Sequence, residues 1–179
     1  MRHQLLSLLV SAGSLAGCTL VDLEVEVRRA CATQPPVAIE GFPETHGALE
    51  HELVFDSEAL LAQFAALDAE VEFAGASVRA AGPATGLAFV EAASLEVASD
   101  DPAVAAVELH ACDGDCAQAD GALELAPSAA LDLLAYAEAG PMTFNLGLVG
   151  SLPHEAWTME VDVCLAAQVH YALGTSDVR

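Results

Sequence analysis

Two cysteines and a histidine lie close together near the middle of the chain and could bind a metal ion. His110, Cys112 and Cys116 form the pattern His-x-Cys-x₃-Cys, and Asp113 and Asp115 lie between the two cysteines. Thiolate, imidazole and carboxylate groups are the ligands that zinc takes in proteins. The spacing is not that of a standard zinc motif, however, and a disulfide between the two cysteines is the favoured alternative.

The same segment is acidic and offers oxygen ligands for a harder cation. Asp113, Asp115 and Asp120 lie close together in the sequence, and carboxylate oxygens are typical ligands of Ca²⁺. The spacing is not that of an EF-hand, because no third acid stands at the required offset and no glutamate closes the loop. We therefore expect a solvated acidic loop and no metal site, and the sequence indicates no other cofactor.

The other reactive side chains form no recognisable catalytic motif. The histidines are scattered without a His-Glu-x-x-His pattern, and no serine stands in the Gly-x-Ser-x-Gly turn of a hydrolase. Paired acids such as Glu50/Glu52 or Glu160/Asp162 can serve a glycosidase, and Trp157 could stack on a sugar. In a chain with 27 acidic residues such pairs arise by chance. We therefore expect Trp157, the only tryptophan, to have a packing role.

The N-terminal residues carry the strongest signal in the sequence. Arg2 and His3 precede an uncharged, mostly apolar stretch at residues 5–16. This stretch has the length of a secretory signal core and is too short to span a bilayer. It ends in Leu15-Ala16-Gly17-Cys18. The segment resembles the lipobox of bacterial lipoprotein precursors, in which a leucine and two small residues precede an obligatory cysteine.

The resemblance implies that residues 1–17 are a signal peptide that is removed, and that Cys18 is the lipidated residue. The thiol of this cysteine would accept a diacylglyceryl group, and cleavage would free its amine for further acylation. Two or three acyl chains make a lasting membrane anchor. In the family, an aspartate after the lipidated cysteine often retains the protein at the inner membrane. Thr19 occupies that position here, which favours the outer membrane.

Lipidation of Cys18 would leave an even number of cysteines, which in an exported protein predicts two disulfides. Four cysteines allow three connectivities. Cys112 and Cys116 enclose only a short segment and should pair locally, which leaves Cys31 to pair with Cys164. Because Cys164 falls in phase with polar residues of its expected strand, its bond must lie on the polar face or require a bulge.

The composition combines strong acidity with enough apolar residues for a core. The chain has five Lys+Arg against 27 Asp+Glu, a formal net charge of −22, and 54% hydrophobic residues. The apolar fraction argues against disorder, and the acidity excludes a nucleic-acid partner because phosphates carry charge of the same sign. No second apolar run approaches the roughly 18 residues of a membrane-spanning helix.

Alternation of apolar and polar residues predicts a mainly β fold. Short helices are expected at residues 57–67, which Ser57 would cap, and after Ser128, and residues 32–47 read as a long connection. These elements predict a single antiparallel β-sandwich domain at residues 18–179, with one or two short helical insertions, after an N-terminal signal helix. The expected strands are 21–28, 49–56, 71–80, 87–98, 104–112, 142–149 and 159–173.

The sequence thus favours a non-enzymatic, membrane-anchored protein of the bacterial cell envelope with a binding or structural domain. Its expected partners are the membrane, through the lipid on Cys18, and a protein of the envelope. Two alternatives remain open: a hydrolase that uses two carboxylates on envelope or extracellular polymers, and a calcium-dependent binding module.

Overall fold

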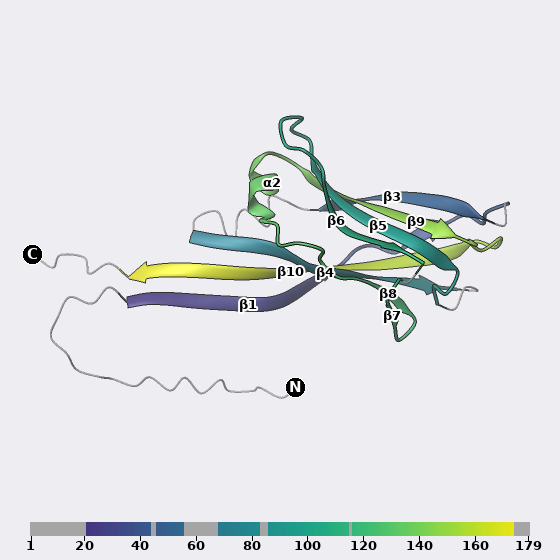
Figure 1. The fold of residues 1–179 in the computed structure, drawn as a ribbon, viewed down its shortest axis with the longest axis horizontal. Helices are drawn as coiled ribbons and strands as arrows, with labels where there is room; N and C mark the ends of the chain where they lie inside the picture. The colour runs from purple at the N-terminus through teal and green to yellow at the C-terminus, as the bar shows by residue number, and fades with distance from the viewer. Residues whose placement is uncertain (1–20, 44–45, 56–67, 83–85, 115, 174–179) are drawn as a thin grey trace, which may run out of the picture.

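The structure is a computed structural model, and the part of the chain that it describes is mostly β (Figure 1). Its elements are β1 (Val21–Thr33), β2 (Val37–Ile39), β3 (Gly47–Phe55), β4 (Asp68–Ala81), β5 (Val90–Ser99), β6 (Val107–Asp113), β7 (Gln118–Ala119), β8 (Ala122–Leu125), α2 (Leu134–Glu138), β9 (Met142–Gly150) and β10 (Trp157–Leu173). The described residues are 21–43, 46–55, 68–82, 86–114 and 116–173.

The strands form two antiparallel sheets that face each other, so the predicted antiparallel β-sandwich is confirmed. The larger sheet has the order β1-β10-β4-β8-β7, with β2 also paired to β10, and the smaller sheet has the order β3-β9-β5-β6. Figure 1 shows the two layers, and it shows that β1, β10 and the start of β4 extend beyond the smaller sheet. The layer that contains these long strands therefore extends further along the strand direction than the other layer does.

The core lies between the sheets because one side chain in two points inward along each central strand. On β9, Met142, Phe144, Leu146 and Leu148 are buried and alternate with partly exposed residues. The ring of Phe144 packs edge-on against Phe55 of its own sheet, with centroids 5.7 Å apart. Phe144 also packs against Phe73 of β4 in the larger sheet, with ring centroids 6.4 Å apart. Aromatic side chains bury large apolar areas, so this contact helps to hold the two layers together.

The helix expected after Ser128 is much shorter than the sequence predicts and begins later. It covers only Leu134–Glu138, and Ser128 does not cap it. The backbone N–H of Ser128 and its hydroxyl both donate to the carbonyl oxygen of Leu109, at 2.8 and 2.9 Å. Ser128 thus satisfies a backbone group of the edge strand β6, which is why its side chain is not available to begin a helix.

Three short strands were not predicted. β2 lies in the segment expected to be a connection, and β7 and β8 form a hairpin in and after the expected acidic loop. Each has four residues or fewer, too few for a clear alternation in the sequence. The expected helix at residues 57–67 and the signal helix lie outside the described residues. No helix among the described residues is long and apolar enough to cross a bilayer.

The alternation of residues 21–28 would place Val25 on a buried face of β1, but Val25 is 40% exposed. β1 is the outermost strand of its sheet in the described structure, and it pairs only with β10. An edge strand is covered less than a central one, so an apolar residue at the right phase can remain accessible to solvent. Alternation therefore predicted the strand correctly but not the burial of Val25.

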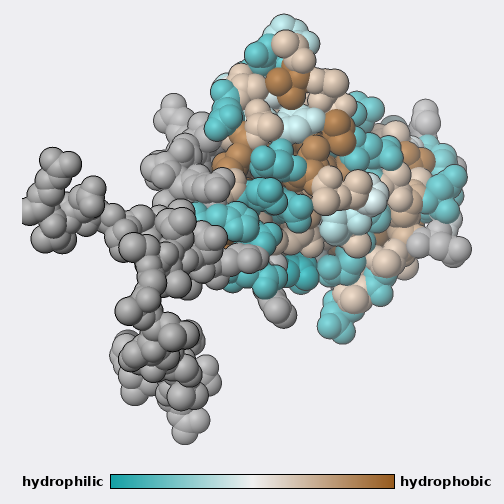
Figure 2. Space-filling model, turned by 60° about the vertical axis from the view of Figure 1, so that its left-hand side comes forward, coloured by the Kyte–Doolittle hydropathy of each residue, from teal (hydrophilic) through white to brown (hydrophobic). Residues whose placement is uncertain are grey.

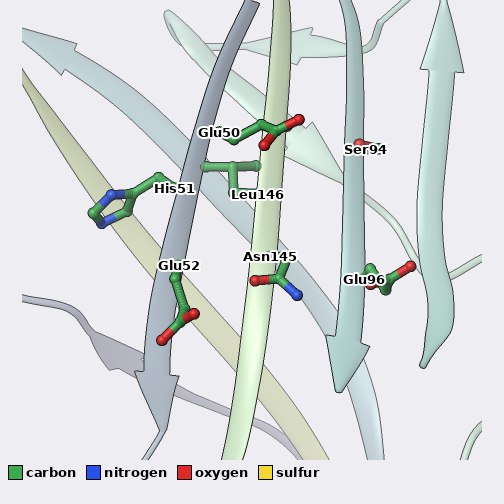
Figure 3. Close-up of a pocket in the computed structure, with 8 residues that line it drawn as sticks. Glu50, His51, Glu52, Ser94, Glu96, Asn145 and Leu146 are labelled. Atoms are coloured by element: carbon green, nitrogen blue, oxygen red, sulfur yellow. The ribbon is translucent and has the colours of Figure 1, made fainter. Parts of the chain in front are cut away.

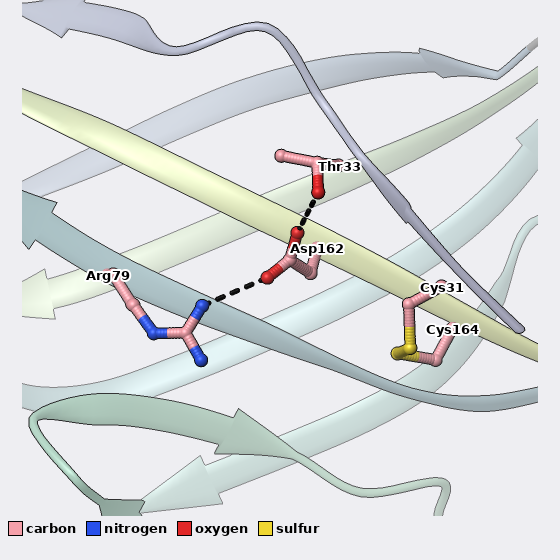
Figure 4. Close-up of polar contacts among 5 residues, drawn as sticks. All are labelled: Cys31, Thr33, Arg79, Asp162 and Cys164. Carbon is pink, nitrogen blue, oxygen red and sulfur yellow. Dashed lines mark hydrogen bonds and ion pairs between the residues drawn. A yellow bond between two sulfur atoms is a disulfide. The ribbon is translucent and has the colours of Figure 1, made fainter. Parts of the chain in front are cut away.

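The structure forms both expected disulfides. Cys112 and Cys116 are joined within one chain turn, and Cys31 is joined to Cys164 across the β1–β10 pair. The second bond lies on the same face of the sheet as Asp162 (Figure 4), and the pairing of β10 with β4 shifts register directly after Cys164. The sequence allowed either a bond on the polar face of the strand or a bulge beside it. In the structure the Cys31–Cys164 bond lies on the face of Asp162, and the bulge follows Cys164.

Gly41 lies where two loops are joined closely. The backbone N–H of Phe42 donates to the carbonyl oxygen of Pro153 at 2.9 Å, and Nδ1 of His154 lies 2.6 Å from the carbonyl oxygen of Phe42. A Cβ atom on Gly41 would collide with the carbonyl group of His154. The collision is with backbone, which cannot rotate away as a side chain can.

We expect Gly41→Ala to lower the free energy of unfolding by about 2 kcal/mol, because the loops must separate to make room for the methyl group. Urea denaturation of the variant measures this loss. Glu40→Ala, at the exposed neighbouring position, is the control and should change stability by less than about 0.5 kcal/mol. Equal stability of the two variants would contradict the close contact at Gly41.

Candidate functional site

The outer face of the smaller sheet carries rows of acidic side chains. Strand pairing places Glu52 opposite Asn145, Asn145 opposite Glu96, and Glu96 opposite Glu108, so four neighbouring strands contribute to one row. We call the outward-pointing acids of these strands the acidic face. Its members are Glu50, Glu52, Glu96, Glu108 and Asp113.

The face exists because each strand alternates and because β9 lies between β3 and β5. Leu53, Leu95 and Leu146 point into the core, so the residues beside them point outward. Glu96 and Glu108 face each other directly, and like charges in such a pair destabilise a sheet. Since none of the four strands contains a lysine or arginine, this repulsion has no cationic neighbour on the sheet itself.

The acidic face is hollowed. A hollow of about 390 Å³ lies over β3, β9 and β5 and is lined by acids of the face together with Ser94 and Asn145. Figure 3 shows Glu52, Asn145 and Glu96 on three neighbouring strands, with His51 directed to the other side of β3. Gly147 forms part of the floor, and a Cβ atom there would lie 2.6 Å from Oγ of Ser94. The hollow therefore depends on a residue without a side chain.

A second hollow adjoins the first. It has a volume of about 330 Å³ and shares Glu50, Ser94 and Gly147 with its neighbour. Its other outward-facing residues are mostly small, such as Ala48, Ala92 and Ala111, and Asp113 lies at its rim. The two hollows thus form one trough with a floor of small residues and an acidic border.

The residues considered for metal binding do not come together. The Cys112–Cys116 disulfide removes both thiolates, and Nδ1 of His110 lies 2.7 Å from the carbonyl oxygen of Ala126. Asp113 ends β6, Asp120 lies in the turn of the β7–β8 hairpin, and Asp115 lies outside the described residues. In the described part of the chain, no three histidine, cysteine or acidic side chains are grouped so that they could hold a metal ion.

Trp157 does not meet the acids of the trough. It is the first residue of β10, in the other sheet, and only 3% exposed. Its ring packs edge-on against Phe89, with centroids 5.7 Å apart. Trp157 therefore packs inside the sandwich, as the sequence predicts, and it is not available to stack on a sugar in the trough.

Of the two acid pairs singled out in the sequence, one lies in the trough and the other does not. Glu50 and Glu52 line the larger hollow. Asp162 instead lies in the larger sheet, where it accepts a hydrogen bond from the Thr33 hydroxyl at 2.6 Å and pairs with the Arg79 guanidinium at 2.9 Å (Figure 4). The hydrogen bond from Thr33, aided by Arg79, lowers the pKa of the Asp162 carboxyl below its usual value.

These contacts make stability depend on pH. Because the folded-state pKa of Asp162 lies below the usual value of 3.8, its stabilisation is present above about pH 4 and is lost as the pH falls through the folded pKa. We expect Asp162→Asn to lower the free energy of unfolding by about 1 kcal/mol at neutral pH. Urea denaturation at pH 7 and near pH 3 should show the difference shrinking in acid, and Thr33→Ala should reproduce part of it. A loss that is the same at both pH values would refute this role.

The apolar side chains of the visible surface are dispersed. Figure 2 shows brown groups separated by hydrophilic residues on the described part of this face, not one continuous apolar area. Large exposed apolar patches usually mark protein or membrane contacts. The part of the surface that is visible in Figure 2 therefore has no apolar patch that marks a contact region more clearly than the trough does.

The fold and the trough define an antiparallel two-sheet β-sandwich with one hollowed acidic face. No protein-family model and no curated protein matches the sequence. Among solved structures, it is similar to the decameric BFDV capsid protein, with 12% identity, a TM-score of 0.41, and coverage of 82% of this chain and 98% of that one. It is also similar to a chain of Desmodium yellow mottle tymovirus, with 9% identity, a TM-score of 0.24, and coverage of 98% and 100%. At these values the likeness carries no argument about function.

Proposed function

We propose that this chain is a lipid-anchored protein of the bacterial outer membrane whose β-sandwich is a non-enzymatic binding domain. The anchor rests on Leu15-Ala16-Gly17-Cys18. β1 begins at Val21, so few residues separate the proposed lipid from the first strand. The sandwich would therefore be held close to the membrane surface.

The observation that carries the binding role is the trough on the acidic face. The inward side of this sheet packs in the hydrophobic core, whereas the side chains of the acidic face point outward and are not part of that core. Like charges face each other there at a cost in stability. Sequences often retain such locally unfavourable arrangements at functional sites.

The hydrolase alternative has one supporting observation, since Glu50, Glu52 and Glu96 line the larger hollow. A glycosidase needs two carboxyl groups placed on either side of a scissile bond and kept in different protonation states. Here Glu52 and Glu96 lie in one row across neighbouring strands on the same face of the sheet, and the buried Trp157 lies in the other sheet. This arrangement supports binding better than hydrolysis.

A binding measurement with envelope preparations separates these functions. The purified full chain with Cys18→Ser, which has no acyl chains to insert, is labelled through a C-terminal tag and mixed with envelopes from cells that lack the protein. Bound label and released soluble fragments are both measured. We expect saturable binding that the unlabelled chain displaces, with no release of fragments. Absence of saturable binding would overturn the proposal. Fragment release that Glu50→Gln abolishes would establish the hydrolase, and binding lost on calcium chelation would establish the calcium-dependent module.

A further inference from the structure

The trough has the shape to receive an extended chain. It runs over neighbouring strands as two adjoining hollows of about 390 and 330 Å³ that share Glu50, Ser94 and Gly147. Along the floor, Ala92, Ser94 and Ala111 leave space where larger residues would fill the groove. The hollow space, and not the acidity alone, marks this face as a place where side chains of another molecule fit.

The charge of the border selects the kind of molecule. Acids lie on both sides of the floor, and none of the four strands carries a lysine or arginine. The two arginines whose side chains are described, Arg29 and Arg79, belong to β1 and β4 in the other sheet. A cationic partner would relieve the repulsion between Glu96 and Glu108, whereas phosphate groups or anionic lipids would increase it.

We propose that the trough binds an extended, arginine- or lysine-rich segment of a partner protein, an inference that rests on the proposed binding function. The long aliphatic stems of such residues can lie along the floor of small residues while their charged ends reach the border. Guanidinium groups form paired hydrogen bonds with carboxylates, so arginine suits the row of Glu52, Glu96 and Glu108 best. The outer face of the smaller sheet thus acts as a binding site that selects a basic, extended segment by its charge.

Peptide titration with charge-matched variants tests the site. The probe is a labelled eight-residue peptide of alternating arginine and valine, and its affinity for the full chain is measured by fluorescence anisotropy. Glu52→Gln/Glu96→Gln/Glu108→Gln removes the three charges of the row and leaves Glu50 and Asp113 in place. The control, Glu70→Gln/Glu124→Gln/Glu160→Gln, removes the same number of charges from strands of the other sheet.

We expect the trough variant to weaken binding at least tenfold and the control to weaken it less than threefold, because general attraction by net charge is reduced equally in both. Ala111→Trp, which fills the floor without changing charge, should also weaken binding about tenfold. Thermal melting verifies that all three variants fold. Equal weakening by the two triple variants, or no effect of Ala111→Trp, would overturn the inference.

The envelope measurement separates this inference from the function on which it rests. Both chains carry Cys18→Ser in this measurement, so that neither attaches through acyl chains. If the trough variant still binds envelopes saturably and as tightly as the chain with the intact trough, the partner binds elsewhere and the inference is overturned, while the binding function stands. If the chain with the intact trough does not bind envelopes, the proposed function fails. Binding of spermine as tightly as the peptide would also contradict the proposal, because a polyamine has no extended backbone to occupy the trough.

Discussion

Removing the Cys31–Cys164 disulfide is expected to lower the free energy of unfolding by about 5 kcal/mol, the largest loss of stability among the changes considered. The bond joins residues separated by 133 positions and thereby closes almost the whole sandwich into one loop. A cross-link restricts the unfolded chain more as the loop grows, and chain-entropy arithmetic gives about 5 kcal/mol for a loop of this length. Against a typical domain stability of about 5–15 kcal/mol, this loss could prevent folding.

The Cys112–Cys116 bond provides the matched control. It spans a separation of only four residues, for which the same arithmetic gives about 2 kcal/mol. The double variants Cys31→Ala/Cys164→Ala and Cys112→Ala/Cys116→Ala leave no unpaired thiol of the broken bond. Urea denaturation without reductant should show the larger loss in the first. Equal losses would show that loop length does not control the stabilisation.

Replacing Cys18 by serine is expected to release essentially all of the protein from stable membrane attachment. In the proposed function the Cys18 thiol accepts the diacylglyceryl group, and a serine hydroxyl cannot take its place, so the precursor would remain uncleaved or be released. Without acyl chains, each of which contributes about 0.8 kcal/mol per buried CH₂, no lasting anchor remains. Metabolic labelling with a radioactive fatty acid and partition into detergent measure acylation and attachment separately.

A variant at the next position separates two properties: acylation of Cys18 and the membrane to which the protein is sorted. Thr19→Asp should leave acylation unchanged and move the protein from the outer to the inner membrane, which a density gradient of the two membranes resolves. A Cys18→Ser protein of mature size that still enters the detergent phase would contradict lipidation at this cysteine. The disulfides are not altered by either change, so stability of the sandwich should stay the same.

The strands and their phases could be predicted from the sequence because each follows from local alternation. The final strand shows this well: Met159, Val161 and Val163 point inward as their spacing requires. The pairing of Cys31 with Cys164 could also be predicted, since elimination left one partner. Short strands such as β2 could not, because a few residues carry too little periodicity.

The trough could be predicted only in part. Alternation places Glu50 and Glu52 on the solvent face of one strand, but their neighbours are determined by the strand order β3-β9-β5-β6. Asn145 and Glu96 become adjacent because β9, from much later in the chain, enters between two earlier strands. Such pairings depend on the whole topology, and no local pattern around Glu96 or Gly147 indicates them.

The position of the Cys31–Cys164 bond also decides how the sandwich responds to mechanical load. Residues Val21 to Val27 of β1 pair with the far end of β10, and the disulfide lies near the opposite end of β1. A pull on the chain before Val21 would break the hydrogen bonds of this strand one after another, as when a zipper opens. The opening would stop at Cys31, where the disulfide bears the force and transmits it to β10, which is paired on its other side with β4. We therefore expect the part of β1 before Cys31 to detach and extend under tension while the rest of the sandwich remains folded.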